Sequence, residues 1–453
     1  MSRTPAFDLR LREAQALRSA GRTDALAASL AQAQAAAAGD ALAQAALAAF
    51  HTQSQDYAAA LTHYDEAVRL APGHTALRYN RAAVSRFLGR LESAEQDLDT
   101  VIAATPHDSE AWQLRSDLRV QTPTHNHVEA LRAHLARGFS RWQDEVPIRY
   151  ALAKELEDLG QHAASWAHLH SGAGLRRRHL TYDVGVDVAT AQWIQDAFAA
   201  RLPCSSAPAT GPLFILGMPR TGSTLLERLL GAHPQVRAAG ELPHLAHSVV
   251  AAAQAAAGGT ALSRAQLIAA SGRADFSALG ADYLQRSAGA HGATPRWIDK
   301  MPLNYLYCGL IARALPGARI LHLTRHPMAT GYALYKTLFA QGYPFSYDLQ
   351  EIAEYYLGYR RLMAHWHATL PGTLLDVSYE ALVTEPARVC AAVYAFCGLE
   401  WQDAYLHPDP SGPATTTASA AQVRRPIYQS SLAQWRHYAA PLQPLAARLS
   451  ALL

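Results

Sequence analysis

The sequence predicts an all-helical N-terminal domain over residues 1–200, followed by an α/β domain over residues 211–453 with a central parallel sheet. At 453 residues the chain is too long for one compact core. Its first 200 residues place apolar side chains at helical spacing, whereas short apolar runs alternate with helical patterns beyond residue 211. The segment ARLPCSSAPATGP, residues 200–212, is rich in Pro, Ser and Ala and marks the predicted boundary.

The helical domain contains an internal repeat of 34 residues. DYAAALTHYDEAVRLAPGH, from Asp56, is followed 34 positions later by RLESAEQDLDTVIAATPHD, and Pro72 pairs with Pro106. Residues 146–172 look like a further helix pair. The period resembles the tetratricopeptide repeat, in which antiparallel helix pairs stack on their neighbours. Such stacks form grooves that bind peptides or partner proteins. We therefore expect either a groove that holds a peptide or protein, or a solenoid that only supports the second domain.

The α/β domain contains four predicted strands, each followed by a helical pattern. They are PLFILG (212–217), RWIDK (296–300), ARILHLTR (318–325) and GTLLDVSYE (372–380). In a parallel sheet with helices on both faces, ligands bind at the carboxyl ends of the strands. All four ends carry polar or charged residues, so we expect the site there.

Composition and cysteine content limit the possible partners and compartment. Charged residues make up 17% of the chain and the net charge is +3, which predicts no nucleic-acid or membrane-surface binding. The N-terminal sequence MSRTPAFDLRLREAQ is charged and has no apolar run, so we do not expect it to be a secretory signal. The four cysteines form no CxxC pair, which indicates buried thiols in a reducing compartment. We expect a cytoplasmic protein without a metal, and we interpret HWH, residues 365–367, as a packing segment of a helix and not as metal ligands.

Residues 217–224, GMPRTGST, nearly match a Walker A loop. Ser223 stands where that motif has its lysine, and Arg220 lies inside the loop. The glycines allow the backbone to approach an anion, and the N–H groups and dipole of the following helix attract it. Without the lysine, ATP hydrolysis and nucleotide kinase activity are disfavoured. A ligand with one 5′-phosphate, extended by another anionic group, fits better. Further donors come from Arg220, Thr221, Ser223 and Thr224.

Several ordered motifs over residues 211–440 resemble the sulfotransferases, which use 3′-phosphoadenosine 5′-phosphosulfate (PAPS) and share a P-loop kinase-like fold. LFILGMPRTGSTLLERLLGAHP is similar to their 5′-phosphosulfate loop, and LTRHPMATGYALYKTLF to their 3′-phosphate segment. VSYEALVTEP with FCGLEW is similar to the segment after the last main strand. TASAAQVRRPIYQSSLAQW resembles the tail of the branch that includes tyrosylprotein sulfotransferases and bacterial proteins joining tetratricopeptide repeats to such a domain. A homodimer is compatible with this branch.

The resemblance implies which residues bind the nucleotide. Arg220 with the loop from Thr221 through Gly222 and Ser223 to Thr224 is expected to bind the 5′-phosphosulfate. Arg325 is expected to bind the 3′-phosphate, with Arg425 as a second contact and Tyr379 near the nucleotide. Ala333 stands where the family usually has a serine, so Thr330 or Lys336 is the alternative partner there.

The resemblance also implies catalytic roles. Glu241 lies at the position of the catalytic base in the tyrosylprotein branch, with His244 as the alternative base. Lys300 matches the lysine beside the leaving-group oxygen, and Ser419 matches a serine close to the transferring group. In-line sulfuryl transfer needs reactants held in position and negative charge offset, so Arg220 and Lys300 suit it.

We therefore expect a PAPS-dependent sulfotransferase acting on a hydroxyl, with a tyrosine of a peptide or protein as the preferred acceptor. A phenol, with a pKa of about 10, loses its proton more easily than an alcohol. Two alternatives stay open. The acceptor can be a sugar, lipid or small metabolite, or the chain can be a repeat scaffold whose enzyme domain has decayed, which Ala333 would favour.

Overall fold

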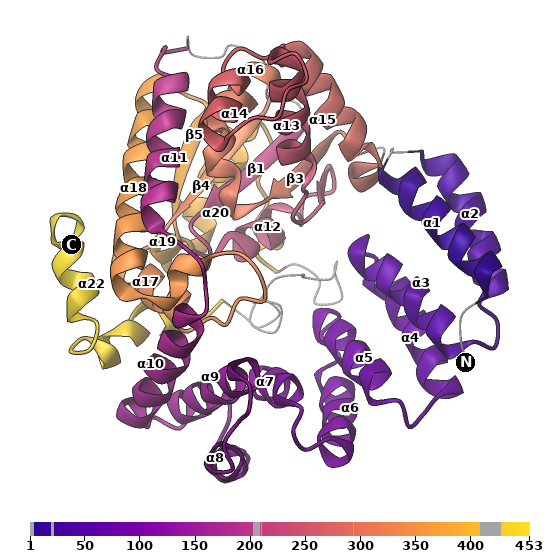
Figure 1. Cartoon of the computed structure of the whole chain (residues 1–453). Helices are drawn as coiled ribbons and strands as arrows, with labels where there is room; N and C mark the ends of the chain where they lie inside the picture. The colour runs from indigo at the N-terminus through magenta and orange to yellow at the C-terminus, as the bar shows by residue number, and fades with distance from the viewer. Residues whose placement is uncertain (1–3, 20–21, 203–208, 210, 293, 408–426) are drawn as a thin grey trace. The chain divides into compact units, whose positions relative to one another are not determined.

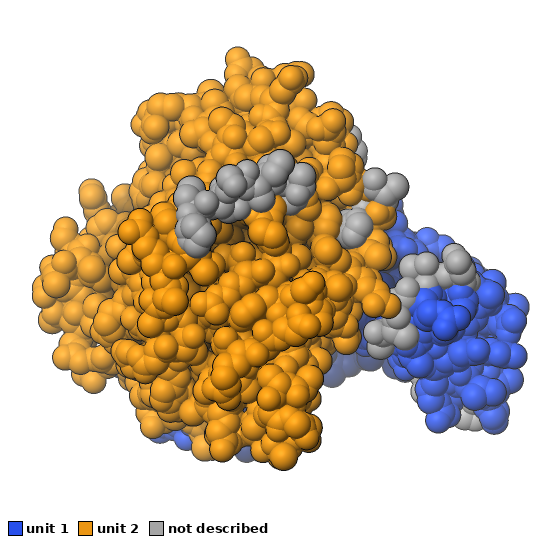
Figure 2. Space-filling view, turned by 90° about the horizontal axis from the view of Figure 1, so that it is seen from above, with its two compact units in different colours: residues 1–180, 411–426 blue, residues 181–410, 427–453 orange. Residues whose placement is uncertain are grey.

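The computed structural model describes residues 4–19, 22–202, 209, 211–292, 294–407 and 427–453, which form two compact units (Figures 1 and 2). The first unit contains the described residues up to Leu180, and the second contains those from Thr181 onward. Ser419 and Arg425, to which the sequence assigned roles, lie outside the described residues, as does Cys204.

The first unit is helical, and its consecutive helices pack on one another in pairs. The 34-residue period places equivalent helices in register: α3 and α4 are followed by α5 and α6, and Pro72 and Pro106 lie in the turns after α4 and α6. The side chains of Asp40, Asp56 and Asp108 accept backbone N–H groups at helix starts, which satisfies donors that would otherwise be orphaned. The helices are α1 (Pro5–Ser19), α2 (Thr23–Ala36), α3 (Ala41–Gln53), α4 (Tyr57–Leu70), α5 (Thr75–Phe87), α6 (Leu91–Ala104), α7 (Ser109–Asp117), α8 (Val128–Ala136), α9 (Trp142–Asp158) and α10 (His162–Arg178).

The second unit is built on a five-stranded parallel sheet in the order β2-β3-β1-β4-β5. Its strands are β1 (Gly211–Gly217), β2 (Val236–Ala238), β3 (Arg296–Lys300), β4 (Arg319–Thr324) and β5 (Leu374–Ser378). The structure confirms the predicted parallel sheet with its four strands, and adds β2, which the sequence analysis missed. β1 is central and buried from Pro212 onward, as expected for an apolar run covered on both faces.

Helices cover both faces of this sheet (Figure 1). On one face Leu213 and Ile215 of β1 belong to a core shared with α12 and α20. On the other face Phe214 meets Tyr283 of α15, with ring centroids 5.8 Å apart. The helices are α11 (Val184–Ala197), α12 (Ser223–Leu230), α13 (His244–Ala256), α14 (Arg264–Ser271), α15 (Phe276–His291), α16 (Cys308–Ala314), α17 (Pro327–Tyr335), α18 (Leu349–Thr369), α19 (Tyr379–Thr384), α20 (Pro386–Phe396) and α22 (Gln443–Arg448). Short 3₁₀ turns are η1 (Pro302–Tyr307), η2 (Pro344–Tyr347), η3 (Asp403–Leu406), η4 (Ser430–Leu432), η5 (Gln434–Tyr438) and η6 (Ser450–Leu452).

Helix α11 belongs to the second unit, although it precedes the boundary predicted at residues 200–212. It packs along α18, and its Ala191 and Ile194 are buried. Among the helices that the structure describes, none has the length and apolar run needed to cross a bilayer.

Candidate active site

The loop after β1 has a backbone shape that depends on glycine. Gly217 has φ +141°, and a Cβ there would lie 2.5 Å from the Leu323 carbonyl oxygen of the neighbouring strand. Gly222 has φ +97°, and a Cβ there would lie 2.3 Å from the ring of Tyr379. Arg220 between them also has a positive φ, +67°, which is uncommon for a residue with a side chain. The loop is therefore a tightly formed turn.

The turn leads directly into α12, whose first residue is Ser223. Thr221 is buried and its hydroxyl donates to the Met218 carbonyl oxygen at 2.7 Å, which closes the loop on itself. The side chains of Ser223 and Thr224 are also buried at the helix start. Backbone N–H groups at a helix N-terminus favour an anion, so this geometry suits a phosphate or sulfate group.

The end of β3 carries a buried cation between two carboxylates. Lys300 is 1% exposed, and its Nζ donates to Glu241 Oε1 at 2.7 Å. A second carboxylate oxygen, Oε2 of Glu227 on α12, lies 3.8 Å from the same nitrogen. Burial raises the pKa of Glu227, and the Lys300 ammonium opposes that rise. Of the two carboxylates, Glu241 keeps 35% of its side chain exposed and Glu227 only 12%, so only Glu241 offers an oxygen to an incoming molecule.

Backbone pairing with β3 brings Glu241 to Lys300. The Ala239 N–H donates to the Ile298 carbonyl at 3.0 Å, and the Lys300 N–H donates to the Gly240 carbonyl at 2.9 Å. Gly240 has φ +71°, which turns the chain at the end of β2 so that the next residue reaches the lysine. The parallel β2–β3 register thus fixes a residue pair that is far apart in sequence.

Behind Lys300, the neighbouring Asp299 points to the opposite face of the strand and is fully buried. It accepts hydrogen bonds from the Tyr283 hydroxyl at 2.9 Å and from the Asn304 amide at 3.2 Å. Burial raises the pKa of Asp299 to about 7, although these two hydrogen bonds and a third from the Leu242 backbone act to lower it. The carboxyl therefore connects α15 and η1 to the loop that carries Glu241.

The end of β4 carries Arg325, which is held by neutral groups. Its two terminal nitrogens donate to the carbonyl oxygens of Arg220, at 2.8 Å, and Ser431, at 2.7 Å. Its guanidinium carbon lies 4.7 Å from the centre of the Tyr379 ring, and the Tyr379 hydroxyl pairs with the Ser431 hydroxyl at 2.8 Å. Its Nε is buried without an acceptor among the described residues. Burial lowers the pKa of Arg325, so an added anion here would stabilise its charged form.

Comparison with known proteins identifies the family to which this region belongs. The family model described as "Sulfotransferase family" matches residues 212–403, which contain the loop, Glu241, Lys300 and Arg325. This region is a sulfotransferase-family domain. A second model, for the tetratricopeptide repeat, matches residues 51–118. Both findings confirm the resemblances seen in the sequence.

The relatives share part of their length with this chain. An uncharacterized protein of Aquifex aeolicus (strain VF5) is 29% identical over 84% of this chain and 51% of its own length. The "Protein-tyrosine sulfotransferase 2" of Gallus gallus is 26% identical over 49% of this chain and 62% of its own length. The solved sulfotransferase domain from the Curacin biosynthetic pathway is 18% identical, covering 55% of this chain and 99% of that chain, with a TM-score of 0.36. This chain therefore spans 51% and 62% of the two curated relatives.

The remaining predicted residues of the sulfotransferase domain lie on α17 and α13. Ala333 is buried inside α17, and Thr330 donates to the Arg325 carbonyl at 3.4 Å. Lys336, at the end of α17, donates to Gln434 at 2.9 Å. His244 begins α13, where burial lowers its pKa and favours the neutral imidazole, so it is still the alternative base.

Sequence reasoning missed Glu227 and Asp299. Both carboxylates lie inside segments whose apolar neighbours are buried, Glu227 in TLLERLL and Asp299 in RWIDK. An acidic residue within such an apolar run is the one signal that could have identified them, because buried carboxylates are rare unless paired. His326 was also missed: its ring stacks on Trp435, with centroids 5.2 Å apart and planes 18° apart.

Proposed function

We propose that this protein transfers a sulfuryl group from PAPS to a hydroxyl, with a tyrosine of a peptide or protein as the preferred acceptor. The observation that carries the proposal is the Lys300–Glu241 pair beside an anion-binding turn in a sulfotransferase-family domain. Support for a tyrosine acceptor comes from relatives that are named protein-tyrosine sulfotransferases.

The residues present fit the donor. Gly222 leaves no room for a Cβ beside Tyr379, so the turn there consists of backbone alone. Backbone N–H groups at a turn that opens a helix favour an anion such as the 5′-phosphosulfate. Arg325 offers a partly buried cation whose described hydrogen-bond acceptors are neutral carbonyl oxygens, which suits a 3′-phosphate. When bound, PAPS supplies an activated sulfuryl group.

Glu241 is the proposed base. Transfer forms a bond between the acceptor oxygen and sulfur, breaks the bond between sulfur and the donor phosphate oxygen, and releases the acceptor proton. The Glu241 carboxylate takes this proton, and an acceptor hydroxyl can reach it because 35% of the side chain is exposed. The Lys300 ammonium holds Glu241 in place and offsets negative charge on the departing oxygen. Arg220 adds positive charge at the turn.

The helical unit is proposed to present the acceptor. Its repeats match the tetratricopeptide model, and stacked helix pairs of this kind bind extended peptides. A peptide acceptor would then gain binding energy remote from the reacting hydroxyl, which raises the effective concentration of that hydroxyl.

The test uses Glu241→Gln, with Glu227→Gln as the matched variant. Both replace a carboxylate beside Lys300, yet only Glu241 is accessible. We expect Glu241→Gln to lower turnover by about 10²–10⁴-fold, as for a lost general base, and Glu227→Gln to lower it less. Both variants should still bind 3′-phosphoadenosine 5′-phosphate by calorimetry. Full turnover in Glu241→Gln would assign the proton transfer to another group, with His244→Ala as the next variant.

An acceptor screen with labelled PAPS tests the substrate class. Label on tyrosyl peptides supports the proposal, whereas label only on sugars, lipids or small metabolites would replace the acceptor. Failure of the wild-type chain to bind 3′-phosphoadenosine 5′-phosphate would identify the domain as a decayed scaffold.

A further inference from the structure

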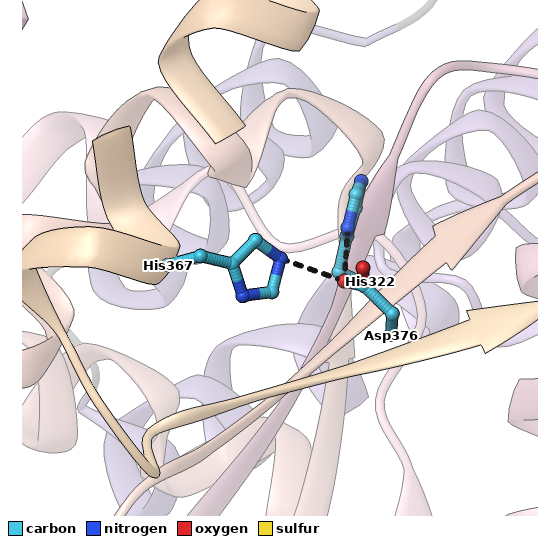
Figure 3. Close-up of side chains that lie close together, drawn as sticks. All are labelled: His322, His367 and Asp376. Carbon is cyan, nitrogen blue, oxygen red and sulfur yellow. Dashed lines mark hydrogen bonds and ion pairs between the residues drawn. The ribbon is translucent and has the colours of Figure 1, made fainter. Parts of the chain in front are cut away.

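Three side chains of metal-ligating type meet on one face of the sheet (Figure 3). His322 of β4 and Asp376 of β5 are register partners, and His367 lies in the last turns of α18. His322 Nδ1 lies 2.7 Å from Asp376 Oδ1, and His367 Nε2 lies 2.9 Å from the same oxygen. Both rings in Figure 3 approach the carboxylate from different sides. The fold thus gathers the cluster from three separate segments.

The geometry of the cluster is close to that of a cation site. One ligand atom from each residue lies within 4.8 Å of the others. Zinc bonds to nitrogen and oxygen of about 2.0–2.2 Å place neighbouring ligand atoms of a tetrahedron about 3.3 Å apart. On binding zinc, the distances from Asp376 Oδ1 to the two histidine nitrogens, 2.7 and 2.9 Å, would therefore widen by about half an ångström. His367 and Asp376 are 40% and 50% exposed, so a cation can enter and a water can complete the coordination.

A fourth residue orients the buried ligand. The Tyr359 hydroxyl contacts Nε2 of His322, which is 1% exposed, so that Nδ1 is the nitrogen directed at the carboxylate. Metal-bound histidines commonly have their other ring nitrogen fixed by such an outer partner. A purely structural hydrogen bond between His322 and Asp376 would not need a second histidine on the same oxygen.

His367 also departs from the packing interpretation of HWH. Trp366 agrees with the packing interpretation: its side chain is 1% exposed, and its Nε1 donates to the Tyr305 carbonyl at 2.8 Å. His365 approaches the Phe198 carbonyl at 3.1 Å. His367 instead turns to Asp376, which leaves a half-exposed imidazole paired with a half-exposed carboxylate.

We propose that His322, His367 and Asp376 bind a divalent transition-metal cation, with Zn²⁺ as the best match to two imidazoles and one carboxylate. The cation ties the edge strand β5 and helix α18 to β4. Since β4 leads to Arg325 and β5 leads to Tyr379, the same cation stabilises the segments that hold these two residues. The site takes no part in sulfuryl transfer, so its test is independent of activity.

The test is a calorimetric titration of the full, tag-free and chelator-treated chain with Zn²⁺ alone. We expect one saturable site and a higher Tm with Zn²⁺ present. His367→Ala, an exposed position, should remove this site, and His365→Ala, two residues away on the same helix, should keep it. Tyr359→Phe should weaken binding by about 10–100-fold, as for loss of an outer partner. Co²⁺ should give the visible absorption of a low-coordinate site in the wild type and not in His367→Ala. Absence of saturable binding, or equal Zn²⁺ affinity in His367→Ala and wild type, would overturn the proposal.

Discussion

The ends of β3 and β4 each present one cation, and the two are compensated in different ways. Lys300 is buried and Arg325 is partly buried. At β3 the ammonium of Lys300 has two carboxylates beside it, Glu241 and Glu227. At β4 the guanidinium of Arg325 is held by two carbonyl oxygens and a tyrosine ring, and no described carboxylate pairs with it. A cation paired within the protein is suited to orient another group, whereas a partly buried cation that donates only to neutral oxygens is suited to accept an anion from outside. The two strand ends therefore differ in the kind of group that each is suited to contact.

Lys300→Met should give the largest effect, because it leaves two carboxylates beside one apolar side chain. We expect turnover to fall by at least about 10³-fold, as for loss of electrostatic stabilisation of developing charge. The free energy of unfolding should fall by about 3 kcal/mol, because a buried pair has lost one partner. Labelled-PAPS assays and urea unfolding measure the two effects. Unchanged stability would show that the carboxylates do not depend on Lys300.

Arg325→Met should weaken nucleotide binding more than it lowers stability. Binding of 3′-phosphoadenosine 5′-phosphate should weaken by at least roughly 30-fold, or about 2 kcal/mol, the cost of truncating a buried charge contact. The unfolding free energy should fall by less than in Lys300→Met. The substitution removes a cation that burial already disfavours, and it leaves no described carboxylate without an ion-pair partner. Calorimetry and urea unfolding of both variants in parallel give the comparison. A stability loss as large as that of Lys300→Met would contradict the proposed difference between the two ends.

Asp299→Asn should give the smallest effect, and it concerns pH. Burial raises the pKa of the Asp299 carboxyl to about 7 from an ordinary value near 4. The folded chain therefore holds a proton that the unfolded chain releases between about pH 4 and pH 7. The stabilisation is complete below pH 4 and is lost as the pH rises to 7.

We expect Asp299→Asn to flatten the fall in unfolding free energy between pH 4 and pH 7 by removing this contribution. Asp282→Asn is the control, because the Arg286 side chain lowers the pKa of Asp282 and its loss acts in the opposite sense. Urea unfolding at several pH values measures both. An identical slope in Asp299→Asn and wild type would show that Asp299 does not titrate in this range.

Local patterns in the sequence predicted much of the site. The turn at 217–224 and the cation at the end of RWIDK are local features, since glycine spacing and a charged strand end are visible in a few residues. The sequence also suggested Glu241 at the position where the structure pairs it with Lys300. The roles assigned to these residues are still predictions.

Tertiary packing decided what the sequence did not reveal. β2 has only three residues, too few for a period-2 pattern, and it exists because it pairs with β3. By sequence α11 is one more helix of the N-terminal region, and its packing on α18 and α14 places it in the second unit. Likewise, His322, His367 and Asp376 come from segments whose proximity depends on the β4–β5 register.

The contact between Gly222 and Tyr379 has a consequence for how this domain can change. The Tyr379 ring fills the volume that any side chain at position 222 would need, and it also stacks on Arg325. A side chain at position 222 would collide with this ring and would also have a strained backbone, because Gly222 has φ +97°. Position 222, Tyr379 and Arg325 are therefore coupled through one ring, so a substitution at position 379 changes both the space beside the turn and the contact with the guanidinium.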